Sequence, residues 1–154
     1  MSKIRAKVGQ LIYTITIPAR RLYKSDKVRS YGIIEHQEKV LIIKNWIGSG
    51  VWSLPGGGSQ PGETPVEALK RELNEETGLV IEETSVELIA EGVHTREFGK
   101  KRFALFHVPY KNKPSVVINY LEIVEHRWIE KHKLHELHPV SHELSRAKQI
   151  ITNR

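Results

Sequence analysis

Residues 56–79, GGGSQPGETPVEALKRELNEETGL, set a glycine-rich loop directly in front of a helix whose two ends are both encoded. Thr64 supplies a hydroxyl at the N-cap, a proline occupies the first helical position, and Glu67 lies three residues after the cap, an arrangement known as a capping box. Gly78 stands where a left-handed glycine commonly ends a helix. The sequence therefore predicts a helix over residues 65–77.

This helix carries three glutamates beside its buried side. Its apolar stripe comprises Val66, Leu69 and Leu73. At about 100° per residue from Leu69, the carboxylates fall at about −20° (Glu76), −60° (Glu72) and −120° (Glu75), whereas Arg71 falls on the other side of the helix. The carboxylates therefore share one arc next to the core.

Clustered carboxylates repel one another, and a cation bound between them removes the repulsion. Oxygen ligands without cysteine favour Mg²⁺, with Mn²⁺ as an alternative. A glycine-rich loop next to the carboxylates allows the backbone to approach a pyrophosphate closely. The combination predicts metal-assisted attack at phosphorus. The alternative interpretation is an acidic helix face exposed to water.

The positive charge of the chain is concentrated at its N-terminus. Residues 1–30 contain eight Lys or Arg and one Asp, which gives +7, whereas the whole chain carries +6. We therefore expect a basic extension over residues 1–30 and a single domain over residues 31–154. The extension either binds a polyanion such as nucleic acid or packs on the domain through its apolar residues, and we favour packing.

Absent residue types restrict the chemistry. The chain contains no cysteine, which excludes disulfides, thiolate metal sites and thiol nucleophiles and fits a reducing compartment such as the cytoplasm. No apolar run is long enough to span a membrane, and we identify no signal peptide. Four histidines crowd residues 132–142, but Pro139 keeps them off a common helix face, so we interpret this stretch as solvent-exposed.

The remaining pattern alternates between strands and helices. Two strands are predicted around a turn at residues 36–38, and a short strand is predicted to end at Pro55. Two further strands are joined by a polar loop over residues 94–101, and one or two more are predicted over residues 114–130. Two short helices are predicted near the C-terminus, and residues 8–23 stay ambiguous between strand and helix. The fold class is α/β with a mixed sheet and helices on both sides.

The spacing of the glycine-rich loop and the helix resembles a complete Nudix box. Gly57 is followed after five residues by Glu63, and seven further residues lead to Arg71 and the run RELNEETGL. The resemblance implies the Nudix-type α/β/α sandwich with a loop-helix-loop catalytic motif. The box covers residues 57–79, the strand order extends the resemblance over roughly residues 30–130, and the N-terminal extension lies outside it.

The resemblance also implies an activity and residue roles. Nudix hydrolases cleave a nucleoside diphosphate linked to another moiety by attack of water at phosphorus, with Mg²⁺ or Mn²⁺. By position, Glu72, Glu75 and Glu76 match the metal ligands, and Glu63 matches the partner of Arg71. Gly57 and Gly58 match the residues that shape the loop on the metal side.

A further carboxylate commonly comes from a late strand or loop in this family. Here Glu122 and Glu125 both qualify, and we prefer Glu125 because it alternates in phase with Arg127 and Ile129. The general base is open between Glu125, Glu75, Glu76 and a water molecule that they hold.

The substrate is not encoded in the box. No proline occurs between Pro65 and Pro109, which argues against ADP-ribose hydrolases of the family. Among the remaining groups of the family, the chain resembles the MutT-like group, which acts on nucleoside triphosphates. Trp46, Tyr31 and Phe98 are aromatic residues able to stack on a base, although core packing is favoured for each. Residues 94–96, including Arg96, lie where a substrate loop is expected.

Several alternatives stay open. The enzyme alternative is an ADP-ribose or nucleotide-sugar pyrophosphatase, and the non-enzyme alternative is a nucleotide- or RNA-binding module of the same fold. The intact box favours an enzyme. A homodimer is compatible with the sequence, and nucleic acid as a partner is not favoured.

Overall fold

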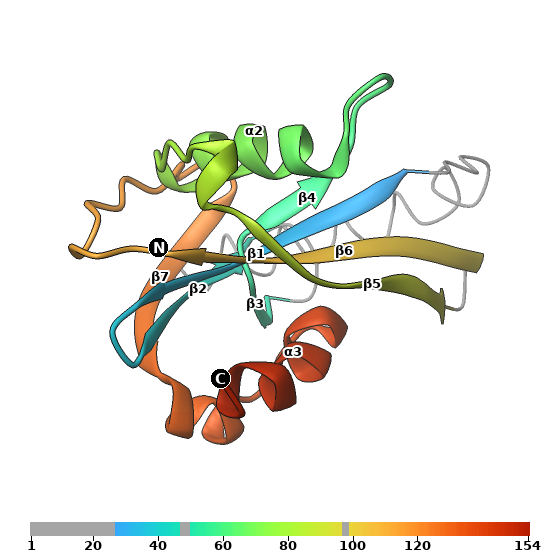
Figure 1. Ribbon diagram of the computed structural model, residues 1–154. Coiled ribbons are helices and arrows are strands. Elements are labelled where there is room, and N and C mark those ends of the chain that lie inside the picture. Colours follow the sequence, from blue (N-terminus) through green and yellow to red (C-terminus); the bar gives the residue numbers. More distant parts are fainter. Residues whose placement is uncertain (1–26, 47–49, 97–98) are drawn as a thin grey trace.

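The computed structural model describes residues 27–46, 50–96 and 99–154. Among these residues, strands form one mixed sheet (Figure 1). The strands are β1 (Val28–His36), β2 (Lys39–Asn45), β3 (Trp52–Ser53), β4 (Gly56–Gly58), β5 (Glu87–Arg96), β6 (Gly99–Pro109) and β7 (Ile123–Glu130). The order is β3-β2-β1-β6-β5, with β4 paired to β1 and β7 paired to β2.

The sheet is mixed because β1 and β6 run parallel, while the other pairs are antiparallel. In β1, five consecutive residues from Ser30 to Ile34 are buried. A strand that is buried on both faces must be covered on both faces, and it therefore reads as a continuous apolar run rather than an alternating one.

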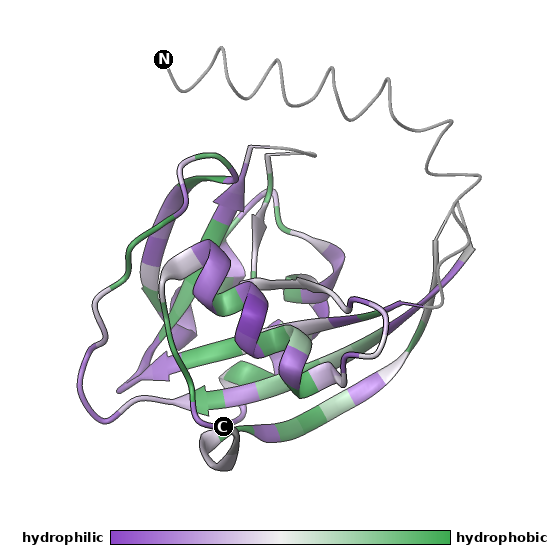
Figure 2. Cartoon of the chain, turned by 90° about the horizontal axis from the view of Figure 1, so that it is seen from above, coloured by the Kyte–Doolittle hydropathy of each residue, from purple (hydrophilic) through white to green (hydrophobic). Residues whose placement is uncertain are grey.

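Helices cover the two faces of the sheet, as Figure 1 shows. On one face, α2 (Pro65–Thr77) packs its apolar stripe on a cluster that includes Ile34, Leu41 and Phe106. Along α2, hydrophobic and hydrophilic residues alternate as expected of an amphipathic helix (Figure 2). The 3₁₀ turn η1 (Glu83–Ser85) follows this helix on the way to β5.

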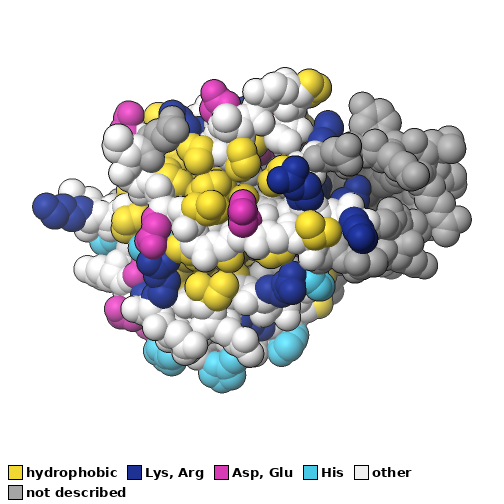
Figure 3. Space-filling model, turned by 45° about the vertical axis from the view of Figure 1, so that its right-hand side comes forward, with side chains coloured by type: hydrophobic (Ala, Val, Ile, Leu, Met, Phe, Trp, Pro, Cys, Tyr) yellow, Lys and Arg dark blue, Asp and Glu magenta, His cyan; other side chains and the backbone are white. Residues whose placement is uncertain are grey.

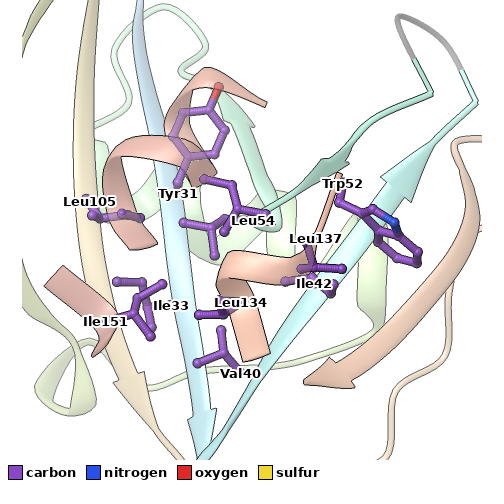
Figure 4. Close-up of a cluster of buried hydrophobic side chains, with 12 residues drawn as sticks. Tyr31, Ile33, Val40, Ile42, Trp52, Leu54, Leu105, Leu134, Leu137 and Ile151 are labelled. Atoms are coloured by element: carbon purple, nitrogen blue, oxygen red, sulfur yellow. The ribbon is translucent and has the colours of Figure 1, made fainter. Parts of the chain in front are cut away.

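On the other face lie η2 (Lys131–Glu136) and α3 (His142–Thr152). Their buried residues pack against strand residues of opposite phase, among them Tyr31, Ile33 and Leu105 (Figure 4). Adjacent residues of β1 thus serve different cores, Ile33 towards α3 and Ile34 towards α2. The result is the predicted α/β/α sandwich.

Most predicted elements are confirmed, and three details differ. The polar loop over residues 94–101 is much shorter than expected, because β5 and β6 pair as far as Arg96 and Gly99. The glycine-rich segment, predicted as a loop, contains the short strand β4, whereas β7 agrees with the one or two strands predicted over residues 114–130. The domain boundary expected at residue 31 falls inside β1, whereas the ambiguous residues 8–23 lie outside the described residues.

No helix in the described part of the chain combines the length and apolar character that crossing a bilayer requires.

Candidate active site

The predicted ends of α2 are confirmed. The Thr64 hydroxyl accepts a hydrogen bond from the Glu67 amide at 3.3 Å, and the Glu67 carboxylate accepts one from the Thr64 amide at 2.8 Å. At the other end, Gly78 adopts a left-handed conformation with φ of 68°, and its amide bonds Asn74 O. These caps satisfy backbone groups at both ends of the helix, which fixes its length and places its carboxylates.

Glu76 is the buried carboxylate of the site, with 4 % of its surface exposed. One oxygen accepts a hydrogen bond from the Gly56 amide at 2.8 Å. Burial, and more weakly the negative charges of Glu72 and Glu122, raise the pKa of Glu76 to about 8. The carboxyl group therefore lacks most of the compensation that a buried charge needs.

The other two carboxylates of the helix are progressively more exposed. The side chain of Glu72 is 16 % exposed and that of Glu75 is 50 % exposed. This order follows their angles to the apolar stripe, from which Glu76 is the least and Glu75 the most distant. Burial raises the pKa of Glu72 as well, against the lowering effect of Arg71.

Arg71 joins the loop to the helix. Its guanidinium donates to both oxygens of Glu63, at 2.7 and 3.0 Å, and to Gly58 O at 3.0 Å. The same group donates to Glu72 and Glu75, each at 3.0 Å. The expected Glu63–Arg71 pair is thus present, but Arg71 is not confined to the far side of the helix: its reach brings it to two of the three carboxylates.

Glu63 is held as an anion. The hydrogen bonds from Arg71, followed by one from the Gln60 amide at 2.6 Å, lower the pKa of Glu63 to about 2. A bidentate pair between guanidinium and carboxylate fixes orientation as well as distance. Glu63 and Arg71 therefore keep the loop against the start of the helix.

The glycines of the loop differ in whether a Cβ atom would fit at their position. Gly56 has a φ of 131°, and a Cβ there would collide with the backbone of Ser30. A Cβ on Gly57 would collide with the Glu72 carboxylate. A Cβ on Gly58 would meet nothing closer than a Lys27 side-chain carbon at 4.0 Å. Gly57 thus admits the Glu72 carboxylate to the loop, whereas Gly58 contributes its carbonyl to Arg71.

The two late glutamates, Glu122 and Glu125, differ in their surroundings. Glu125 bonds Arg127 at 2.7 Å on the strand β7. Glu122 precedes that strand in a turn that begins at Asn119, whose amide donates to Glu76 O at 3.0 Å. The charge of Glu122 raises the pKa of both Glu72 and Glu76, although burial is the larger cause in each. The charge of Glu122 therefore reaches the carboxylates of α2, whereas Glu125 bonds an arginine of its own strand.

The donor atoms of these carboxylates are of the kind that a hard divalent cation prefers. Their donor atoms are all oxygen, and burial raises the pKa of both Glu72 and Glu76, a cost to their charged forms that a cation would offset. In the described part of the chain, however, no three His, Cys, Asp or Glu side chains are already gathered to hold a metal ion. A cation bound by Glu72 and Glu75 would compete with Arg71, which donates to both carboxylates.

The predicted substrate residues are dispersed. Trp46 follows β2, and its backbone amide donates to Glu122 O at 3.0 Å; among the described residues its buried indole nitrogen finds no hydrogen-bond partner. Tyr31 is 5 % exposed and belongs to the core beneath α3. Arg96 is the last residue of β5, and its side chain, like all of Phe98, lies outside the described part.

Arg29 is a cation near the carboxylates of α2 that the sequence did not single out. Its guanidinium donates to the Tyr31 hydroxyl at 3.2 Å. The pKa of Arg29 is raised, chiefly by Tyr31 and more weakly by the negative charges of Glu143 and Glu72. The available signal was the alternation of Arg29, Tyr31 and Ile33 along one strand, which places all three on the face that α3 covers.

A cavity of about 270 Å³ lies between this face of the sheet and α3. Its lining comprises Tyr31, Ala90, Phe103, Leu105, His142, Glu143, Arg146, Gln149 and Ile150. Arg29 bonds the tyrosine of this lining and also acts electrostatically on Glu72 and Glu76. Arg29 is thus within electrostatic range of Glu143 in this lining and of Glu72 and Glu76 on α2.

Replacement of Glu63 by glutamine tests the architectural role of the ion pair. We expect kcat to fall by roughly 10- to 100-fold, since partners of functional side chains typically contribute that much. The melting temperature should fall as well, because the loop loses its bond to the helix. Both are compared with Glu76→Gln. A Glu63→Gln enzyme as inactive as Glu76→Gln, with an unchanged melting temperature, would place Glu63 in the chemistry instead.

Comparison with known proteins agrees with this geometry. The family model described as "NUDIX domain" matches residues 26–148. An ADP-ribose pyrophosphatase of Methanocaldococcus jannaschii is 48 % identical over 62 residues, which cover 39 % of this chain and 37 % of that protein. An RNA pyrophosphohydrolase of Ruthia magnifica is 37 % identical over 85 residues, which cover 55 % and 44 % respectively. The chain thus spans less than half the length of these curated relatives.

Solved structures show the same fold at greater evolutionary distance. The MutT protein from Methanosarcina mazei Go1 superposes with a TM-score of 0.69 at 20 % identity, covering 82 % of this chain and 93 % of that one. The dihydroneopterin triphosphate pyrophosphohydrolase of E. coli gives a TM-score of 0.69 at 18 % identity, covering 86 % and 99 %. At such identities the likeness concerns the fold alone.

Proposed function

The chain belongs to the Nudix hydrolase family, and on that premise we propose that it is a divalent-cation-dependent enzyme that cleaves a pyrophosphate bond. Its substrate is a nucleoside diphosphate linked to another moiety, with a nucleoside triphosphate as the favoured case. The observation that carries this proposal is Glu76, a buried carboxylate with a pKa raised to about 8 beside Glu72 and a glycine-rich loop.

We assign the cation, Mg²⁺ or Mn²⁺, to Glu72, Glu75 and Glu76. When bound, it supplies positive charge that offsets the charge developing on the phosphoryl oxygens. The Gly56 amide fixes one oxygen of Glu76, and Arg71 orients Glu72 from the loop side. Preorganisation of these side chains is the contribution of the protein, because phosphoryl transfer depends mainly on position and charge.

Glu122 replaces Glu125 as the preferred general base. Its carboxylate would accept a proton from the attacking water, next to the cation ligands. We expect Glu122→Gln to lower kcat by roughly 10²- to 10⁴-fold, the range typical of a lost general base. The matched variant Glu125→Gln should stay within about 3-fold of the wild type, since its carboxylate bonds an exposed arginine and such pairs contribute little. Steady-state kinetics at saturating Mg²⁺ measure both, and the opposite ranking would restore Glu125.

A panel of substrates tests the proposed activity. It contains the four ribonucleoside triphosphates, ADP-ribose, a nucleotide sugar and a short 5′-triphosphorylated RNA, each with Mg²⁺, with Mn²⁺ and with EDTA. We expect release of pyrophosphate or phosphate from at least one nucleotide only when a cation is present. Absence of turnover throughout the panel, with substrates still bound, would support the alternative of a non-catalytic binding module.

RNA is included in this panel for two reasons. One reason is the basic N-terminal residues, most of which lie outside the described part, and the other is a relative named as an RNA pyrophosphohydrolase. If the 5′ end of RNA is the substrate, its kcat/KM should exceed that of the free triphosphate and fall steeply with salt, because phosphate contacts release counterions. If free nucleotides are the substrate, the dependence on salt should be weak.

A further inference from the structure

The start of β6 carries three consecutive cations, Lys100, Lys101 and Arg102. Because β1 and β6 run parallel, with Val28 opposite Arg102, both strands begin at the same end of the sheet. The fold therefore brings this triplet next to Lys27, which precedes β1. Figure 3, in which this end of the sheet comes forward, shows Lys and Arg side chains gathered on that side. We call these four residues, Lys27 and the triplet, the basic edge.

The charges of the basic edge are available to a ligand. Lys27, Lys100 and Arg102 are exposed, and Lys101 is half-buried. Within the described part of the chain, none of the three cations of β6 forms an ion pair with a carboxylate. The residues of β5 opposite them, 93–95, include no carboxylate either. A row of cations without neighbouring anions attracts an anionic ligand.

The basic edge adjoins the glycine-rich loop of the active site. Side chains alternate between the two faces along a strand, so Lys100 and Arg102 lie on the same face of the sheet as Phe106. Phe106 packs in the cluster beneath α2, which makes this the face that carries the carboxylates of the site. A side-chain carbon of Lys27 lies 4.0 Å from the position that a Cβ on Gly58 would take. The row of cations therefore leads away from the loop along one face.

The spacing of these cations fits a chain of phosphates. Lys100 and Arg102 are two residues apart on one face of a strand, which places their Cα atoms about 7 Å from each other. An extended polynucleotide strand presents its phosphates at a similar repeat. A free nucleoside triphosphate instead carries its charge in one compact group, which the cation at the carboxylates of α2 would already engage. Contacts of Lys and Arg with successive phosphates supply affinity that is independent of sequence.

We infer that the basic edge binds the phosphate backbone of an RNA strand whose 5′ end reaches the carboxylates of α2. Binding of the strand stands on the charge and position of the basic edge alone. The placement of the 5′ end rests on the proposed function, because an RNA strand with a 5′ triphosphate is a nucleoside diphosphate linked to another moiety.

Fluorescence anisotropy measures binding of the strand without turnover. The probe is a 3′-labelled oligoribonucleotide of about 10 nucleotides, within the range that single-strand sites cover, with a 5′-hydroxyl end and in EDTA. The logarithm of the affinity of the full chain should fall linearly with the logarithm of the salt concentration. In Lys100→Gln/Arg102→Gln, this slope should be smaller by about 1.4, since each phosphate contact on a single strand contributes about 0.7. The affinity at about 0.1 M salt should be roughly 10- to 30-fold weaker.

The control Lys39→Gln/Lys111→Gln removes the same charge at the other end of the sheet. Both lysines are exposed, one at the start of β2 and one just after β6. Its affinity should stay within about 3-fold of the wild type, because distant surface charges are screened. Equal weakening by the two double variants would reduce the effect to net charge and overturn the inference. Failure of the wild type to bind the RNA, or an affinity independent of salt, would overturn it as well.

Two further results are decisive. If circular dichroism shows the double variant to be unfolded, Lys100→Gln and Arg102→Gln taken singly decide, each with a slope expected to be smaller by about 0.7. Sedimentation with vesicles of phosphatidylserine and phosphatidylcholine tests a membrane as the partner. Binding to these vesicles through Lys100 and Arg102, without binding of RNA, would assign the basic edge to an anionic membrane and overturn the inference.

Failure of the proposed function gives a different result. RNA binding that the double variant loses, without turnover of any nucleotide, would refute the hydrolase and leave the basic edge as an RNA-binding surface. In an active hydrolase, the double variant should raise the KM for 5′-triphosphorylated RNA while kcat is retained, because the lost contacts are the same in the ground state and the transition state. An unchanged KM would overturn the placement of the 5′ end.

Discussion

Replacement of Glu76 by glutamine is expected to lower kcat by roughly 10³-fold or more with saturating Mg²⁺, because it removes a charged ligand from a site whose chemistry depends on charge. The substitution preserves the shape of the side chain and the acceptor for the Gly56 amide. The fold should therefore persist. Glu75→Gln should act in the same direction.

Steady-state rates of nucleotide hydrolysis measure this effect, and circular dichroism verifies that the variant is folded. The matched control is Glu82→Gln, an exposed carboxylate just beyond α2, which should retain the wild-type rate. A folded Glu76→Gln enzyme with near-wild-type kcat in Mg²⁺ would remove Glu76 from the catalytic site.

The same substitution is expected to stabilise the cation-free protein at alkaline pH. Burial raises the pKa of Glu76 from 4.5 to about 8, so the folded state binds this proton more tightly than the unfolded state. The resulting stability is present below pH 4.5 and is lost as the pH rises through 8. Glutamine carries no such charge, and Glu76→Gln should gain about 1–4 kcal/mol over the wild type at pH 9.

Urea denaturation in EDTA at pH 6 and pH 9 measures this difference between wild type and variant. Addition of Mg²⁺ at pH 9 should stabilise the wild type more than the variant, because a cation compensates the buried charge. A wild type that is equally stable at both pH values, with no advantage for the variant, would show that the Glu76 charge is already compensated within the protein.

The helix at the centre of the site could be predicted to the residue. Its start and end depend on local chemistry, a capping box at Thr64 and a left-handed glycine at Gly78, and both operate within a few residues of sequence. The ranking of the three carboxylates by burial also follows from periodicity alone. Short-range rules were sufficient wherever the structure is determined by short-range interactions.

The contacts of Arg71 with Glu72 and Glu75 were missed because angles around the helix axis place Cα atoms and not the ends of long side chains. Arg71 and Glu75 are four residues apart, which is about 40° around the helix axis, and the long side chain of an arginine easily spans that separation. The helical angle was correct, but the interpretation that Arg71 stays apart from the carboxylates was wrong.

Glu122 and Arg29 depend on tertiary placement. The preference for Glu125 assumed a strand phase, whereas Glu122 lies in the turn before β7 that bonds the end of α2. Arg29 belongs to a basic stretch that was interpreted as an extension over residues 1–30, although β1 already begins at Val28. Their electrostatic effects on Glu72 and Glu76 are not visible in the sequence, since each joins segments that are far apart in the chain.

The central claim is that Glu76 and its neighbours hold the catalytic cation, and electron paramagnetic resonance of Mn²⁺ tests it most directly. Titration of the wild-type protein should remove the signal of free Mn²⁺, while Glu76→Gln should leave most of that signal at the same concentrations. Equal Mn²⁺ binding by the two proteins would contradict the assignment of the cation to this site.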